Sequence, residues 1–207
     1  ERAAVRENYH RFCAAIGVDE TRLVMTHQVH EDGIRVATAA DVLPDLLDPI
    51  DYRVDGLVTN TPGLALTIYY ADCIPVLLYD PVGKAIAAVH SGWRGTSLGI
   101  APKAVAKMTA LYGPRPEDVL AAIGPGIGPC CFETDGDVPE AMRAALGVDA
   151  DTYITVKGPK FHVDLAGLNR QWLLRAGLLP ERIEVSGICT ACRPDLFWSP
   201  RKMGDQR

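Results

Sequence analysis

Residues 73–90, "CIPVLLYDPVGKAIAAVH", contain the stretch that decides the fold. Two runs rich in Val, Ile, Leu and Ala flank the sequence "DPVG" at 80–83, which is typical of a turn. We therefore predict a β-hairpin in which residues 73–79 pair with residues 84–90 across a four-residue loop.

The register of this hairpin places a cysteine next to a histidine. With this loop, Tyr79 pairs with Lys84, and Cys73 then lies directly opposite His90 with Cβ atoms about 4.5–5.5 Å apart. That separation suits two ligands of one metal ion, or a thiolate–imidazolium pair. A bulge at Pro75 would break the register. The plain alternative is that Cys73 is a small buried side chain and His90 only ends a strand.

The rest of the chain alternates helical and β-like patterns. We expect helices at 3–16, 97–113, 137–146 and 165–177, and strands at 22–26, 33–38, 64–71, 73–79, 85–90, 119–124 and 183–187. We find no internal repeat and no clear linker. The sequence therefore predicts one α/β domain over residues 1–207, with a mixed, partly antiparallel sheet flanked by helices.

Composition excludes several classes of function. The 207 residues are 48% hydrophobic and carry a net charge of −5, which argues against a nucleic-acid partner. No stretch is long and apolar enough to span a membrane, and the first residues do not resemble a signal peptide. Six cysteines in a chain of this size favour reduced thiols in the cytoplasm. We expect a monomer or a small homo-oligomer.

A third ligand could come from "THQVH" at 26–30, which offers His27 and His30. One cysteine with two histidines would hold zinc with an open fourth position, as in catalytic sites. The same set describes a blue-copper centre. These motifs contain no methionine, and five histidines are too few for a multicopper oxidase. Zinc is therefore preferred to copper.

The other cysteines form two groups in the sequence. "CTAC" holds Cys189 and Cys192, and "PCC" holds Cys130 and Cys131. Together they could form a second zinc site, but a single C-x-x-C without a clear second half is a weak signal. We expect partly buried free thiols near the site, and we place Cys13 in the core.

Three charged residues could assist chemistry beside the metal. Asp72 is a candidate proton relay because it precedes Cys73. Arg94 and Arg201 are candidate phosphate ligands, because the guanidinium fork matches phosphate oxygens. A surface salt bridge, or packing of Arg94 on Trp93, is an equally good explanation for these arginines.

Six motifs, taken in order, resemble a known family. They are "THQVH", "DGLVTN", "ADCIPVLLYD", "AVHSGWRGT", "IGPGIGPCCFE" and "CTACRPDLFWSPR". This series is similar to the laccase-domain family, also called the YfiH or multicopper polyphenol oxidoreductase-type family, whose members act as purine nucleoside phosphorylases. The matches run from about residue 8 to residue 201.

The resemblance implies an α/β fold similar to the catalytic domain of cytotoxic necrotizing factor. It also implies one zinc ion held by His30, Cys73 and His90, which selects His30 over His27. The substrates it implies are adenosine, inosine, guanosine and methylthioadenosine with phosphate, together with deamination of adenosine. Some members are described as editing peptidoglycan precursors.

Other functions remain open at this stage. A metal-free cysteine hydrolase, or an amidase acting on a peptidoglycan precursor, would use Cys73 as nucleophile and His90 as base. His30 speaks against it, because a thiol enzyme needs no second histidine there. A polyphenol oxidase and a non-enzymatic binding module rank lower.

Overall fold

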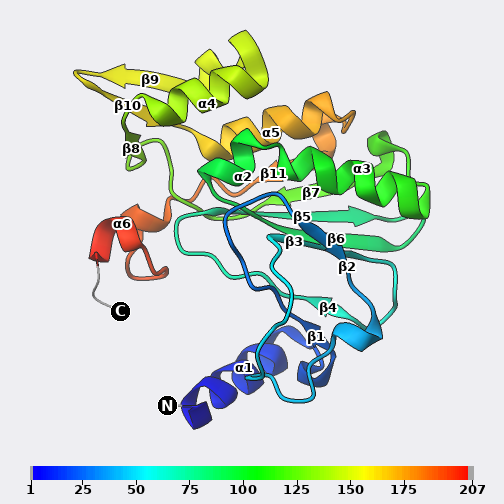
Figure 1. Cartoon of the computed structure of the whole chain (residues 1–207). Coiled ribbons are helices and arrows are strands. Elements are labelled where there is room, and N and C mark those ends of the chain that lie inside the picture. The colour runs from blue at the N-terminus through cyan, green and yellow to red at the C-terminus, as the bar shows by residue number, and fades with distance from the viewer. Residues whose placement is uncertain (1, 205–207) are drawn as a thin grey trace.

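A mixed six-stranded sheet forms the centre of the structure, a computed structural model that describes residues 2–204 (Figure 1). Across the sheet the strands are β11 (Ile183–Val185), β7 (Leu120–Ile123), β5 (Ile74–Asp80), β6 (Ala85–Ser91), β3 (Gly56–Thr59) and β2 (Ile34–Val36). The two outermost pairs are parallel and the inner pairs antiparallel. This confirms the predicted single α/β domain with a mixed sheet.

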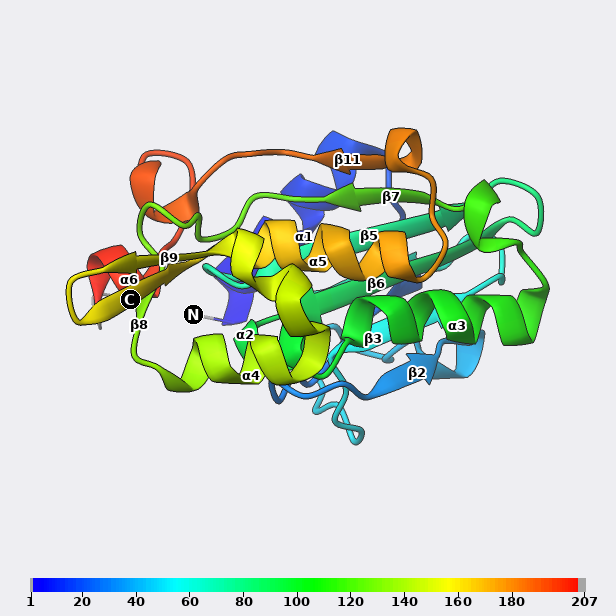
Figure 2. The same cartoon turned by 90° about the horizontal axis from the view of Figure 1, so that it is seen from above.

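Helices cover one face of this sheet, as Figures 1 and 2 show. They are α2 (Trp93–Ser97), α3 (Ile100–Tyr112) and α5 (Leu165–Arg175), with α4 (Asp137–Leu146) beyond them. Apolar side chains from the strands and from α3, α4 and α5 form the main buried core. Beside α4 lies a small antiparallel sheet of β8 (Glu133–Thr134), β10 (Lys160–Val163) and β9 (Ile154–Lys157).

The N-terminal part lies on the other side of the sheet (Figure 1). It contains α1 (Arg2–Ile16) and a parallel pair of short strands, β1 (Leu23–Val24) and β4 (Ala65–Leu66). The short helix α6 (Pro200–Met203) comes near the end of the described chain. Single turns of 3-10 helix occupy Glu20–Arg22, Ala39–Asp41, Pro116–Asp118, Pro180–Arg182 and Thr190–Cys192, and a longer 3-10 segment occupies Gly147–Tyr153. Within residues 2–204, none of the helices has the length and apolar character needed to cross a bilayer.

The predicted hairpin is present, but its register is wrong by two residues. Asp80 pairs with Ala85 and Pro75 pairs with His90, so Cys73 lies just before the strand. The Asp80 carboxylate accepts hydrogen bonds from the backbone N–H groups of Val82 and Gly83, at 2.9 and 2.7 Å. Such a side-chain-stabilised turn begins one residue later than the predicted loop. Because the shift is an even number, every side chain keeps its predicted face.

Candidate metal centre

His30, Cys73 and His90 converge where the central strand β5 begins and β6 ends, and we call them the metal cluster. Their candidate ligand atoms all lie within 4.8 Å of one another. His30 comes from the loop after β1, Cys73 from the bend before β5, and His90 from β6. The two imidazole rings meet edge to face, with centroids 4.8 Å apart. His27 instead forms an isolated bridge with Arg53, away from the cluster.

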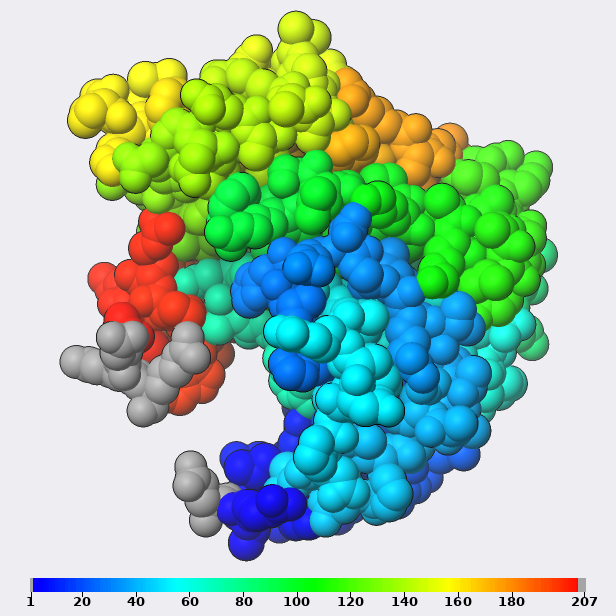
Figure 3. All heavy atoms as spheres, in the orientation of Figure 1, coloured from blue at the N-terminus to red at the C-terminus, as the bar shows by residue number. Residues whose placement is uncertain are grey.

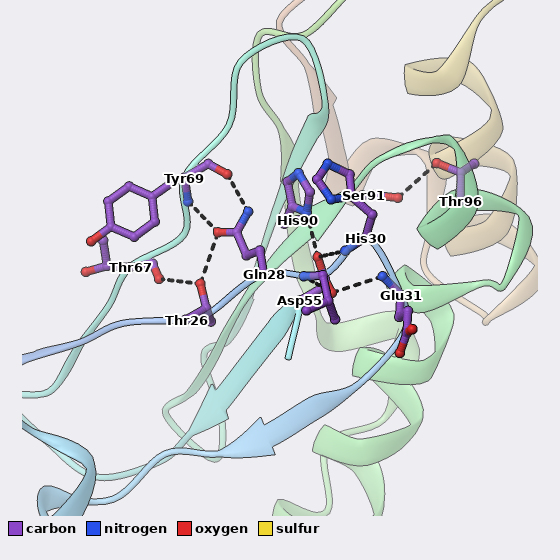
Figure 4. Close-up of polar contacts among 11 residues, drawn as sticks. Thr26, Gln28, His30, Glu31, Asp55, Thr67, Tyr69, His90, Ser91 and Thr96 are labelled. Carbon is purple, nitrogen blue, oxygen red and sulfur yellow. Dashed lines mark hydrogen bonds and ion pairs between the residues drawn. The ribbon is translucent and has the colours of Figure 1, made fainter. Parts of the chain in front are cut away.

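Asp55, which directly precedes β3, organises this cluster (Figure 4). Its fully buried carboxylate lies 2.8 Å from Nδ1 of His90. It also accepts backbone N–H bonds from Val29, His30 and Glu31 at 2.9–3.0 Å. With Nδ1 held by Asp55, Nε2 of His90 is the nitrogen left for a metal, and a carboxylate behind a histidine is the usual partner of such a ligand.

The backbone of His30 is unusual and explains these contacts. Its φ of 62° lies in the left-handed region, which a residue with a side chain rarely adopts. That conformation turns three successive N–H groups toward one point and creates a concave anion site. The Asp55 carboxylate fills it, so the strained backbone and the buried charge stabilise each other.

Gly92 leaves room for the cluster. A Cβ atom at this position would lie 3.1 Å from Sγ of Cys73 and 3.3 Å from Cδ2 of His30. These distances are shorter than ordinary van der Waals contact, so a larger residue would require Cys73 or His30 to shift by a few tenths of an ångström. Gly92 in "HSGW" thus allows these two ligands to approach closely.

Burial determines the protonation states of Cys73 and His30 when no metal is bound. Burial, with smaller contributions from Asp72 and Asp55, raises the pKa of the Cys73 thiol to about 11. Burial and the neighbouring His90 lower the pKa of His30. At neutral pH the metal-free site therefore holds a thiol and a neutral imidazole, which does not favour a free thiolate nucleophile. The donor set fits a metal ion that displaces the thiol proton.

The sequence-based argument against copper is weaker than expected. Met25 directly precedes "THQVH" in the sequence, and Met203 of α6 lines the same cavity as the metal cluster. A cysteine, two histidines and a nearby methionine are the residue types of a blue-copper centre. Copper thus keeps its place as the second candidate after zinc.

The metal cluster opens into a cavity of about 510 Å³, within the range of small-molecule sites. Figure 3 shows the molecule hollowed between the C-terminal part, coloured red, and the blue and cyan parts. The wall of the cavity is largely aromatic and apolar, with a few polar groups. The lining residues include Gln28, Tyr69, Tyr70, Trp198, Ser199, Pro200 and Met203. Gln28 is fixed by paired hydrogen bonds to the backbone of Tyr69, at 2.6 and 2.7 Å (Figure 4).

The hydrogen bonds of Asp72 point to a structural contact and not to the proton relay predicted for it. Its carboxylate accepts hydrogen bonds from Thr190 Oγ1 at 2.6 Å, from Ser199 Oγ at 2.9 Å and from the backbone N–H of Arg201 at 3.0 Å. Both oxygens are thereby engaged with the segment at 189–204, which we call the C-terminal segment. A proton relay through Asp72 stays a prediction that no contact in the structure supports.

The two arginines differ in what they can offer a phosphate. Arg94 is exposed beside the cluster, with its guanidinium 4.5 Å from the centre of the Trp93 ring. Across residues 2–204 that guanidinium forms no hydrogen bond or ion pair, so its N–H groups are available to bind an anion. Arg201 instead donates from Nη1 to the carbonyl oxygens of Cys131 and Glu133, at 3.3 and 2.8 Å. Arg94 is therefore the stronger candidate.

Asp55 and Gln28 were not predicted as site residues, although both lie within the motifs "DGLVTN" and "THQVH". The signal for Asp55 was an acidic residue directly before the short apolar run "GLVT". The structure also gathers Cys130, Cys131, Cys189 and Cys192 into one group of thiols, an arrangement for which the sequence offered only a weak signal. Cys13 of α1 is buried as expected, with 2% of its surface exposed.

Known proteins resemble this chain over most of its length. A purine nucleoside phosphorylase, YlmD of Bacillus subtilis, is 41% identical over 150 residues, which cover 72% of this chain and 53% of that protein. The chain thus spans about half the length of that relative. An adenosine deaminase, RL5 of an unknown prokaryotic organism, is 35% identical over 196 residues, covering 91% of this chain and 73% of the other.

A solved structure agrees with the fold. The crystal structure of YlmD from Geobacillus stearothermophilus superimposes with a TM-score of 0.90 at 32% identity, covering 98% of this chain and 76% of that one. The family model described as multi-copper polyphenol oxidoreductase laccase matches residues 1–207. The chain belongs to this laccase-like family, whose relatives include proteins named purine nucleoside phosphorylase.

Proposed function

We propose that this chain is a zinc-dependent purine nucleoside phosphorylase that also deaminates adenosine. The observation that carries the proposal is the convergence of His30, Cys73 and His90 within 4.8 Å at one end of a cavity. The names of the relatives give the reaction class, a phosphorylase in one case and an adenosine deaminase in another.

The metal cluster has the composition of a catalytic zinc site. Three protein ligands leave a fourth position open, whereas a structural site closes on four. A zinc ion held there would supply Lewis-acid chemistry and activate water near neutral pH. Asp55 would keep the His90 ring oriented, and Gly92 would keep space between the ligands.

The cavity wall suits a purine nucleoside. Tyr69, Tyr70 and Trp198 present flat aromatic surfaces that can stack on a base. Arg94, whose charge acts on His30, supplies an uncommitted cation near the metal cluster for inorganic phosphate. The substrate range proposed is adenosine, inosine, guanosine and methylthioadenosine. All six cysteines lie among residues 2–204 and none is in a disulfide there, which supports the cytoplasmic location proposed for this enzyme.

Two product assays test the proposal. With adenosine and phosphate the protein should release adenine and ribose 1-phosphate, and without phosphate it should form inosine and ammonia. Removal of metal by a chelator should abolish both reactions, and added zinc should restore them. Copper restoring more activity than zinc would overturn the choice of metal.

Arg94→Ala separates the two reactions. We expect phosphorolysis to fall about tenfold or more, while deamination, which consumes only water, changes little. Arg143→Ala is the matched control, because Arg143 pairs with Asp151 on the far side of α4. Equal loss of both reactions would contradict the phosphate role.

The metal-free alternative predicts the opposite pattern. A cysteine hydrolase or peptidoglycan-precursor amidase would resist the chelator, lose activity on alkylation of Cys73 and ignore nucleosides. In the zinc enzyme the metal should protect Cys73 from alkylation, because the thiolate is already a ligand. Full amidase activity in the metal-free protein would refute the zinc proposal.

A further inference from the structure

Four cysteines from two distant segments meet outside the proposed active site. Cys130 and Cys131 lie in the loop after β7, and Cys189 and Cys192 lie at the turn after β11. The four Sγ atoms all lie within 4.8 Å of one another. Since about sixty residues separate the two pairs along the chain, the fold itself creates this four-cysteine cluster.

The sulfur spacing fits a shared ion. Sγ of Cys192 lies 3.5 Å from Sγ of Cys131 and 3.6 Å from Sγ of Cys130. A disulfide would require about 2.05 Å. Tetrahedral zinc with Zn–S bonds of about 2.3 Å places its sulfurs about 3.8 Å apart. The observed distances are close to the second value.

The surrounding backbone is arranged for the sulfurs. The N–H of Gly128 donates to Sγ of Cys189 at 3.2 Å, and such bonds stabilise a thiolate. A Cβ on Gly128 would lie 3.2 Å from Cβ of Cys189 and 3.3 Å from Sγ of Cys130. Gly128 thus lets the two cysteine segments approach closely.

A cation lies beside the cluster. Four thiolates around a divalent ion carry a net negative charge, which a nearby positive group offsets. The guanidinium of Arg201 donates to the carbonyl oxygen of Cys131 at 3.3 Å. Arg201, first considered as a phosphate ligand, is therefore placed to stabilise this cluster.

We propose that Cys130, Cys131, Cys189 and Cys192 bind a second zinc ion as a closed, four-thiolate structural site. The ion would join the loop after β7 to the C-terminal segment. Trp198, Pro200 and Met203 of that segment line the cavity, so the second ion would hold one wall of the cavity in place. The inference does not depend on the reaction proposed above.

Metal analysis of the purified, reduced full chain tests the proposal. Wild type should contain about two zinc ions per chain, and Cys192→Ser and His30→Ala should each contain about one. Cys13→Ala is the matched control and should keep both, because Cys13 is buried in α1 away from the clusters. A Cys192→Ser variant with the zinc content of wild type would overturn the four-cysteine site, whereas an unchanged zinc content in His30→Ala would count only against the metal cluster.

A second measurement needs no variant. Alkylation followed by peptide mass mapping should find these four thiols protected in the zinc-loaded wild type and reactive after chelation under reducing conditions. Cobalt added to the stripped protein should give strong thiolate-to-cobalt charge-transfer absorption, mostly retained in His30→Ala. Equal alkylation with and without zinc, or a disulfide between two of the four, would refute the proposal.

Discussion

Asp55 shows how a residue that touches no substrate can determine a site. It is fully buried, and four groups donate to its carboxylate: Nδ1 of His90 and three consecutive backbone N–H groups. Burial would raise its pKa, but these hydrogen bonds outweigh it and hold the pKa of Asp55 below its ordinary value. Asp55 therefore stays ionised and fixes both histidines, one through its ring and one through its backbone.

Replacing Asp55 by Asn should weaken metal binding. The amide cannot accept from all four donors, and its own N–H groups would face other donors, so His90 loses its orientation. We expect zinc affinity to fall about 10–100-fold, measured by competition with a chromogenic chelator. Asp51→Asn, on an exposed neighbour, is the control. Unchanged zinc affinity in Asp55→Asn would contradict this role.

Among single residues, the metal ligands could be predicted from the sequence, but the residues that position them could not. Cys73 and His90 follow from two apolar runs around a turn, and His30 from the family motif. Asp55 acts mainly through backbone N–H groups, which carry no sequence signature. Met203 reaches the cavity only because the C-terminal segment folds back onto it.

At the scale of elements, the C-terminal segment forms one wall of the cavity. Ser199 caps α6 by accepting from the backbone N–H of Lys202 at 3.2 Å, and its hydroxyl donates to Asp72 at 2.9 Å. Asp72 thus links the bend that carries Cys73 to the helix that carries Met203. Its φ of 78°, in the left-handed region, belongs to this bend.

Asp72→Asn tests whether this residue positions the wall or relays protons. Loss of charged hydrogen bonds should loosen the wall and raise KM for adenosine, lowering kcat/KM about tenfold while zinc content is unchanged. A proton relay would instead lower kcat at constant KM and alter its pH profile. Asp195→Asn is the control, because that exposed carboxylate on the same segment pairs only with Arg193 among residues 2–204.

Helices were easier to predict than strand pairing. The helix expected at 137–146 has these bounds in the structure, and α5 ends two residues before the predicted 177. Helix signals are local, because they rest on spacing and end residues. The hairpin register depended on whether Asp80 ended a strand or began a turn, and only its contacts with the backbone of the turn decide this.

At the scale of the whole molecule, the mixed sheet was predicted but its strand order was not. β3 was missed because its four residues are all buried and show no alternation. It nevertheless lies between β2 and β6 and begins directly after Asp55. Of the strand expected at 64–71 only Ala65–Leu66 forms, and the strands β9 and β10 were not predicted. Pairings between distant segments depend on the complete fold.

Global stability should depend on pH through a second buried carboxylate, Asp41, which is 8% exposed. Burial alone would raise its pKa. Hydrogen bonds from the backbone and hydroxyl of Thr38, at 2.8 and 3.0 Å, and from Nε of Arg35, at 2.7 Å, outweigh burial and lower the pKa. A carboxyl group with a lower pKa in the folded state stabilises the fold above its unfolded pKa of about 3.9. That contribution disappears as pH falls through the folded pKa.

Asp41→Asn should therefore destabilise the protein at pH 7, and its difference from wild type should shrink as pH falls through the folded pKa of Asp41, below which Asp41 is protonated in wild type as well. We expect the free energy of unfolding to fall by about 1–3 kcal/mol at neutral pH, because the charged hydrogen bonds are lost. Urea unfolding of both proteins across this pH range measures the difference. Release of metal in acid affects both proteins alike, so their difference isolates Asp41. Asp51→Asn should follow wild type throughout, and a constant gap between Asp41→Asn and wild type would show that the loss comes from packing and not from the charge.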